Sequence, residues 1–235
     1  MAARQLAQIS LDYDTAPERP SGEPVFEVRS FYNPERRSAL NIVPGLIGVI
    51  LTLTMVLFTA VAIVREAERG NLELLINTPV RSLELMIGKI IPYVLIGLVQ
   101  VSIILALGML LFGVPVRGAL YQVYLAALLF IAANLTLGLV ISTAAKTQFQ
   151  AMQMTFFFFL PSILLSGFMF PFAGMPKAAQ YLSELLPLTH FIRMIRGIML
   201  RGASLGDMPG EVLALVVFAG VTLMLAVLRF SKTLD

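Results

Sequence analysis

The sequence contains no cysteine, a single histidine and few charged residues. Without cysteine the chain forms no disulfide and offers no thiolate to a metal ion. Charged residues make up 13% of the chain and hydrophobic residues 58%, whereas soluble proteins carry about 25% charged residues. This balance excludes an ordinary soluble domain. The net charge is +3 and no run of basic residues occurs, so we expect no nucleic-acid partner.

Five stretches long enough to cross a bilayer contain no Asp, Glu, Lys or Arg: residues 42–64, 90–116, 118–145, 147–176 and 212–228. A helix crosses the apolar core of a bilayer with about 20 residues at a rise of about 1.5 Å each. The sequence lacks the alternating segments that build membrane β-barrels. We therefore predict an all-α polytopic membrane protein with spans at about 43–64, 88–112, 119–145, 152–170 and 211–229.

A charged connector, residues 65–89, joins the first two predicted spans. Leu75 shares one helical face with neighbouring aliphatic residues, and Pro79 follows a threonine that could cap a second helix. This pattern predicts an amphipathic helix at the membrane surface. A second helix then bends into the bilayer and kinks at Pro92.

The fourth predicted span is followed by an irregular region rich in proline and glycine. Pro161, Gly167 and Pro171 interrupt it, so we expect the span to end near Phe170. Residues 178–201 then form an amphipathic segment, which either lies in the membrane interface or dips partway into the bilayer. Its apolar face holds Leu188, Phe191, Ile192, Ile195 and Met199, and its polar face holds His190, Arg193, Arg196 and Arg201.

The first 40 residues differ from the rest of the chain. They contain no apolar signal segment, and residues 24–32 alternate like one β-strand before a turn at Asn33-Pro34. Because one strand forms no sheet alone, we expect residues 1–40 to be the remnant of a larger domain and residues 41–235 to be the membrane domain. Basic residues are nearly equal on the two sides of the predicted spans, so their count does not decide the orientation.

The connector carries a resemblance to a known family. The run Val64-Arg65-Glu66-Ala67-Glu68-Arg69-Gly70-Asn71-Leu72-Glu73-Leu74-Leu75, then Thr78-Pro79-Val80-Arg81 and Gly88-Lys89-Ile90-Ile91-Pro92-Tyr93, resembles the ABC-2 family of ATP-binding-cassette transporter permeases. Further matches are Tyr32-Asn33-Pro34-Glu35, Ser166-Gly167-Phe168-Met169-Phe170-Pro171, Pro187-Leu188-Thr189-His190 and Arg196-Gly197. The resemblance covers nearly the whole chain in order.

The resemblance implies that residues 65–77 form the coupling helix region, which contacts a separate ATPase subunit on the cytoplasmic side. The residues implied in this contact are Arg65, Glu66, Glu68, Arg69, Gly70, Glu73, Leu75 and Pro79. It also implies that residues 1–40 and 171–210 are extracytoplasmic and that the chain lacks a first span. Asn71 stands where threonine is usual. The implied assembly pairs two permease subunits, identical or paralogous, with two ATPases in the cytoplasmic membrane.

The predicted function is therefore export of a hydrophobic or amphipathic substrate, driven mechanically. Gly88-Lys89 is not a phosphate loop. Leu83 occupies the position of the loop's first glycine, and Ile90 the position of its serine or threonine. We expect ATP hydrolysis in the partner, so this chain is not an enzyme and has no cofactor or metal. Candidate hinges are Pro92, Pro161, Pro171 and Pro187, and candidate path residues are Gln100, Asn134, Phe168 and Met169.

Simpler interpretations stand beside these. In a simpler interpretation, the connector's charge pairs do no more than stabilise a solvated helix. Gln100 and Asn134 in the same way do no more than join helices. No second histidine or carboxylate stands at metal-ligand spacing from His190. This favours a role for His190 as an interfacial residue over a metal or proton site. A secondary transporter would bury ionisable residues in its spans, and a membrane transferase or protease would need more than Glu184 and His190 near the interface. The remaining alternatives are a non-transporting anchor or regulatory subunit and a truncated permease fragment.

Overall fold

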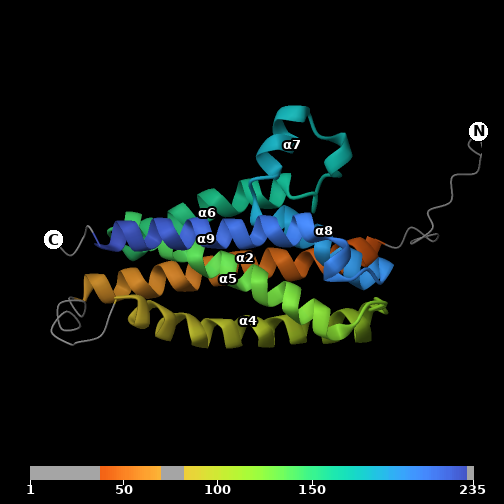
Figure 1. Ribbon diagram of the computed structural model, residues 1–235, viewed down its shortest axis with the longest axis horizontal. Coiled ribbons are helices and arrows are strands. Elements are labelled where there is room, and N and C mark those ends of the chain that lie inside the picture. Colours follow the sequence, from red (N-terminus) through yellow and green to blue (C-terminus); the bar gives the residue numbers. More distant parts are fainter. Residues whose placement is uncertain (1–37, 70–81, 232–235) are drawn as a thin grey trace, which may run out of the picture. The chain divides into compact units, whose positions relative to one another are not determined.

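The computed structural model describes residues 38–69 and 82–231, and within these ranges the chain forms helices and no strand (Figure 1). Five long helices are apolar enough to cross a membrane, which confirms the all-α polytopic class. They are α2 (Ser38–Glu68), α4 (Ser82–Phe112), α5 (Leu120–Ala144), α6 (Gln148–Leu165) and α9 (Pro209–Ser231). Between α6 and α9 lie η1 (Phe172–Gly174), α7 (Lys177–Ser183), α8 (Pro187–Arg196), the π-helix η2 (Gly197–Arg201) and η3 (Leu205–Asp207).

Helix α5 is the central element of the described bundle. It contacts α2, α4, α6, α8 and α9, and 72% of its apolar span is buried, against 17% for α6 and α9. Because α5 carries no charged residue, each of its faces can pack against another helix. The large side chains Phe130, Ile131 and Leu135 are fully buried there. The outer helices α4, α6 and α9 turn most of their apolar side chains outward, as expected for contact with lipid.

Small residues and hydroxyls set the closest helix contacts. A Cβ at Gly138 of α5 would lie 2.7 Å from the Thr59 Cβ and 3.0 Å from the Val56 carbonyl oxygen of α2. The small residue Gly138 thus allows α2 and α5 to approach closely within this chain. Hydroxyl bonds join further pairs: Ser102 with Tyr124 over 2.7 Å, and Thr136 with Thr222 over 2.8 Å.

The return between α4 and α5 is attached to η2 through the backbone. The Arg117 N–H donates to the Met199 carbonyl over 2.9 Å, and a Cβ at Gly118 would come within 2.6 Å of the Ile198 carbonyl oxygen. The return at residues 113–118 therefore also holds the end of the α8 and η2 segment.

Two predicted boundaries differ from the structure. The first span does not give way to a separate helix near residue 64: α2 continues through Glu68, because its last residues are good helix formers. The helix that corresponds to the fourth predicted span, 152–170, is Gln148–Leu165. The Thr147 hydroxyl caps it by accepting from Gln150 N (3.1 Å). After Ser166, Gly167 has a φ of +80°, a left-handed conformation that an α-helix excludes.

The predicted prolines occupy distinct positions. Pro92 lies inside α4 and Pro161 inside α6, and neither ends its helix. Pro171 precedes η1, and Pro187 is the first residue of α8, where its missing N–H costs nothing. The kinks and hinges at these residues stay predictions. The strand predicted at residues 24–32 and the connector between residues 70 and 81 lie outside the described residues.

Candidate functional site

The last turn of α2 carries the described part of the predicted ATPase contact. Arg65 Nε donates to Gln148 Oε1 over 3.2 Å, and the Gln148 backbone N–H donates to Glu68 Oε1 over 2.9 Å. The Gln148 side-chain amide also donates to the Glu68 carboxylate. Because Gln148 begins α6, these bonds hold the α5–α6 return against the end of α2. The polar start of α6 and the charged end of α2 therefore lie side by side.

Four of the eight predicted contact residues are described: Arg65, Glu66, Glu68 and Arg69. The other four, Gly70, Glu73, Leu75 and Pro79, lie outside the described residues. Glu66 lines a pocket of about 240 Å³ between α2, α4 and α5, together with Pro92, Tyr93 and Leu139. The described end of α2 therefore presents charged side chains beside a gap between three helices.

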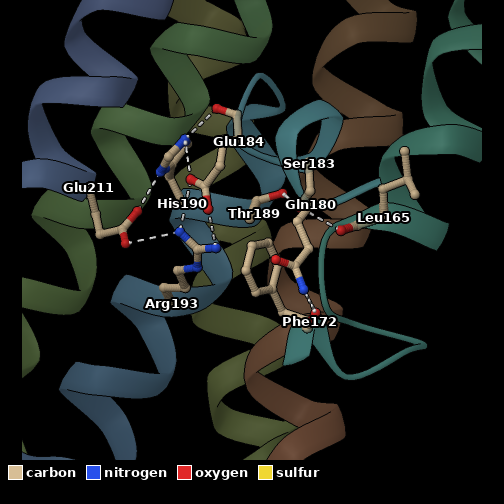
Figure 2. Close-up of polar contacts among 9 residues, drawn as sticks. All are labelled: Leu165, Phe172, Gln180, Ser183, Glu184, Thr189, His190, Arg193 and Glu211. Carbon is tan, nitrogen blue, oxygen red and sulfur yellow. Dashed lines mark hydrogen bonds and ion pairs between the residues drawn. The ribbon is translucent and has the colours of Figure 1, made fainter. Parts of the chain in front are cut away.

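A second polar site lies at the other end of the spans and is shown in Figure 2. His190 and Arg193 of α8 meet Glu184, which precedes α8, and Glu211, which lies in the first turn of α9. His190 Nδ1 bonds the Glu211 carboxylate, and Nε2 lies 2.9 Å from the Glu184 carbonyl oxygen. Arg193 donates to both carboxylates, over 2.6 Å to Glu184 Oε1 and 3.3 Å to Glu211 Oε1. We call these four residues the α8–α9 cluster.

The amphipathic pattern of α8 explains how the α8–α9 cluster is positioned. The predicted apolar face is confirmed, because Leu188, Phe191, Ile192, Ile195 and Met199 are all buried. The Phe191 ring stacks on Phe130 of α5, with ring centroids 4.2 Å apart and planes 12° apart. Seated in this way, α8 packs against α2, α5 and α9 and turns His190 and Arg193 toward the start of α9.

Arg193 sets the electrostatics of the cluster. Its hydrogen bond lowers the pKa of the Glu184 carboxyl, and the bond to Glu184 raises the pKa of the Arg193 guanidinium in turn. The guanidinium carbon also lies 4.5 Å from the centre of the Phe172 ring, within range of a cation–π contact. The ion pairs of the α8–α9 cluster therefore lie close together. His190, which stands beside them, is only 8% exposed.

Arg196 joins α8 to two more elements. Its guanidinium donates to the Gly167 carbonyl after α6 (3.1 Å) and to the Asn41 carbonyl at the start of α2 (3.2 Å). Burial lowers the pKa of Arg196. Since Asn41 and Glu68 stand 27 residues apart in α2, the cluster end and the charged end are separated by about 40 Å.

The four predicted path residues do not form one site. Gln100 of α4 accepts a bond from the Thr54 hydroxyl of α2 over 2.9 Å, so it joins two helices. Asn134 of α5 is fully buried and donates to the carbonyl of residue 130 over 2.8 Å. Phe168 packs where a Cβ on residue 45 would stand, and Met169 is exposed. A role in transport stays a prediction for all four.

Glu211 and Gln148 are the residues that sequence reasoning missed. The sequence signal for Glu211 was an acidic side chain in the first turn of the last span, where the helix dipole favours it. The signal for Gln148 was its place in the short polar return before α6. Across residues 38–69 and 82–231, no group of three His, Cys, Asp or Glu residues is arranged to hold a metal ion.

Comparison with known proteins places these features in a family. The family described as ABC-2 family transporter protein matches residues 3–228. The probable multidrug ABC transporter permeases YbhS and YbhR of Escherichia coli (strain K12) are each 32% identical to the chain. The matches cover 91% of the chain and 57% of YbhS, and 99% of the chain and 64% of YbhR.

A third relative is the inner membrane transport permease YhhJ of the same strain, 31% identical over 92% of the chain and 59% of YhhJ. The chain thus spans about three fifths of the length of these relatives. The family match covers the charged end, the five long helices and the α8–α9 cluster alike. The chain belongs to the ABC-2 family of transporter proteins.

Proposed function

We propose that the chain is the permease subunit of an ABC exporter, driven by ATP that a separate nucleotide-binding subunit hydrolyses. The relatives named as multidrug ABC transporter permeases support this proposal. The name of YhhJ supports a place in the inner, cytoplasmic membrane. The proposed cargo is hydrophobic or amphipathic, since the described spans are almost free of charge and offer an ionic cargo few partners.

The observation that carries the mechanism is the link between the last turn of α2 and the start of α6. Arg65 and Glu68 both bond Gln148, so a push on the end of α2 also reaches α6. Helix α2 packs on the buried α5 along its length, which favours rigid movement of the helix over local bending. In this proposal an ATPase that docks at residues 65–77 tilts these helices together.

The proposal makes the charged end cytoplasmic and the α8–α9 cluster extracytoplasmic. The five candidate spans of the described residues are too few to enclose a path alone, so the proposed assembly contains two permease subunits and two ATPases. The outward apolar faces of α4, α6 and α9 supply surface for a second subunit as well as for lipid.

The test combines charge reversals at Glu66 and Glu73 with a control at the other end. In vesicles with the partner ATPase, Glu66→Lys with Glu73→Lys is expected to leave insertion and ATPase activity in place. ATP-driven uptake of an amphipathic dye into inverted vesicles is expected to fall at least about tenfold, which corresponds to about 1.4 kcal/mol of lost coupling. Lys177→Glu on α7 is the control and is expected to leave transport unchanged. Unchanged transport in the double variant contradicts the proposed contact.

The same assay separates the alternative of a non-transporting anchor. If the unaltered chain assembles with an active ATPase but no dye of any charge accumulates on ATP addition, the chain serves as an anchor or regulatory subunit. The connector would then still bind the ATPase, because both functions need that contact.

A further inference from the structure

We propose that His190 is a positioning residue controlled by its proton: the imidazolium holds the α7–α8 segment to the start of α9, and loss of one proton weakens this attachment. The proposal concerns how the chain is held together at the α8–α9 cluster. It does not depend on the cargo or on the ATPase contact.

Both ring nitrogens of His190 face hydrogen-bond acceptors. His190 Nδ1 faces the Glu211 carboxylate and Nε2 faces the Glu184 carbonyl oxygen at 2.9 Å. Both partners are acceptors, since an ionised carboxylate and a backbone carbonyl carry no hydrogen to donate. Only the imidazolium has an N–H on both nitrogens. A neutral ring would point a lone pair at one of these oxygens.

The charge of the surroundings also favours the imidazolium. Two carboxylates, on Glu184 and Glu211, face one guanidinium on Arg193, so a charged His190 brings the cluster to neutrality. Within residues 38–69 and 82–231, the other packed elements supply no substitute cation: α5 and α6 contain no charged residue, and α2 carries its charges in the last turn, about 40 Å away. The tyrosines of α5 bond Ser102 and Gln122 instead. Lys177 and Arg201 are exposed residues of α7 and η2.

Burial makes the loss of a proton costly to the structure. His190 is 8% exposed, so water has little access to an imidazole nitrogen that loses its hydrogen. The neutral ring leaves an unmatched negative charge in the cluster and a carbonyl that faces a lone pair. Both effects weaken the contact between the segment before α8 and the first turn of α9.

A neighbouring contact does not titrate and confines the effect to the cluster. The Ser183 hydroxyl donates to the Leu165 carbonyl over 2.7 Å and lies 3.1 Å from the Thr189 hydroxyl. This tie anchors the end of α7 at one point, Ser183, whatever the state of His190. We therefore expect deprotonation to loosen the α7–α8 segment against the first turn of α9 and to leave the bundle folded.

The sign of the pH dependence follows from these contacts. The attachment through His190 is present in acid and is lost as the pH rises, because the charged ring is the form that bonds both acceptors. Histidine is the side chain that ordinarily changes charge between about pH 5 and 8. On the acid side, the bond from Arg193 lowers the pKa of Glu184, so that carboxylate stays ionised while the imidazolium forms.

The single histidine of the chain allows a direct test of the ring. The full chain, purified without a histidine tag and placed in lipid bilayers, is labelled with ¹⁵N-histidine, and the ring nitrogens are observed by solid-state NMR. Protonation of both nitrogens at about pH 5.5, and loss of one by about pH 9, is the expected result. A neutral ring at the lower pH, or two protonated nitrogens at both pH values, overturns the proposal.

The absence of cysteine allows a matching test of the movement. Spin labels at Tyr181→Cys on α7 and Leu213→Cys on α9 occupy exposed positions, and their separation is measured across the same pH range. We expect a narrow distance distribution in acid that becomes at least twice as broad in alkali.

Variants separate a proton-controlled role from a merely structural one. His190→Gln is expected to give the broad distribution at every pH. Lys177→Gln, a charge change outside the cluster, is expected to leave the profile as it was. A pH profile that is the same with and without the histidine overturns the proposal even if both proteins fold.

Discussion

Gly138 offers a sharp test of how α2 and α5 pack. In Gly138→Ala the new Cβ would meet the Thr59 Cβ at 2.7 Å and the Val56 carbonyl oxygen at 3.0 Å, neither of which is the end of a flexible side chain. Alanine improves helix propensity by about 1 kcal/mol over glycine, and overpacking costs about 1–3 kcal/mol. The net change in the free energy of unfolding should therefore lie between about zero and 2 kcal/mol of destabilisation.

Gly220→Ala on α9 is the matched control, because no atom lies within 4 Å of the added Cβ. This variant gains only the higher helix propensity of alanine over glycine, so it should stabilise the chain by about 1 kcal/mol. The two variants should differ by at least about 1 kcal/mol, or about fivefold in the unfolding equilibrium. The measurement is unfolding in mixed micelles, followed by circular dichroism during an SDS titration.

A compensating change sharpens the test. Thr59→Gly removes the side-chain atoms that the Cβ added by Gly138→Ala would strike, and the Thr59 hydroxyl has no hydrogen-bond partner in the described residues, so no such bond is lost. The double variant should recover at least about 1 kcal/mol relative to the sum of the single changes. Equal stabilisation by Gly138→Ala and Gly220→Ala, or strict additivity with Thr59→Gly, would refute this account of the contact.

Three further changes test the polar contacts. Glu68→Ala should change overall stability little because the bond is exposed to solvent, but it should speed hydrogen exchange at the Gln148 amide, and unchanged exchange counts against the tie. Arg196→Ala should cost about 1–2 kcal/mol of unfolding free energy in detergent, and Arg196→Lys should not recover it because lysine lacks the planar fork that reaches two carbonyls. Arg193→Met should raise the pKa of Glu184. The stability that this carboxylate contributes, present above its unfolded pKa and lost as the pH falls, should then disappear at a higher pH in unfolding measurements across a pH series.

The long helices could be predicted from the sequence because charge is so costly inside a bilayer. Stretches without any ionisable residue have few alternatives to a spanning helix, and all five were found. The ends of the helices were less accessible. Helix α6 begins at Gln148 because of the Thr147 cap and ends before Gly167, and these effects are worth only about 1 kcal/mol each. Such small terms shift a boundary by several residues without changing the fold.

The polar sites depended on contacts that no local pattern encodes. His190 and Glu211 are 21 residues apart and belong to different helices, so their pairing follows from how α8 packs on α9. The bonds of Gln148 with the end of α2 bridge 80 residues or more. The apolar face of α8, in contrast, was readable because helical periodicity predicts which side chains share a side.

The hydrogen bond that joins the α4–α5 return to η2 uses main-chain atoms only. Arg117 contributes its N–H, which every residue type except proline possesses, and Met199 its carbonyl, which every residue type possesses. Exposed side chains on this return can therefore change without breaking this bond, whereas any larger residue at Gly118 would strike the backbone of residue 198. Surface chemistry on this face is free to drift while the two hairpins stay joined.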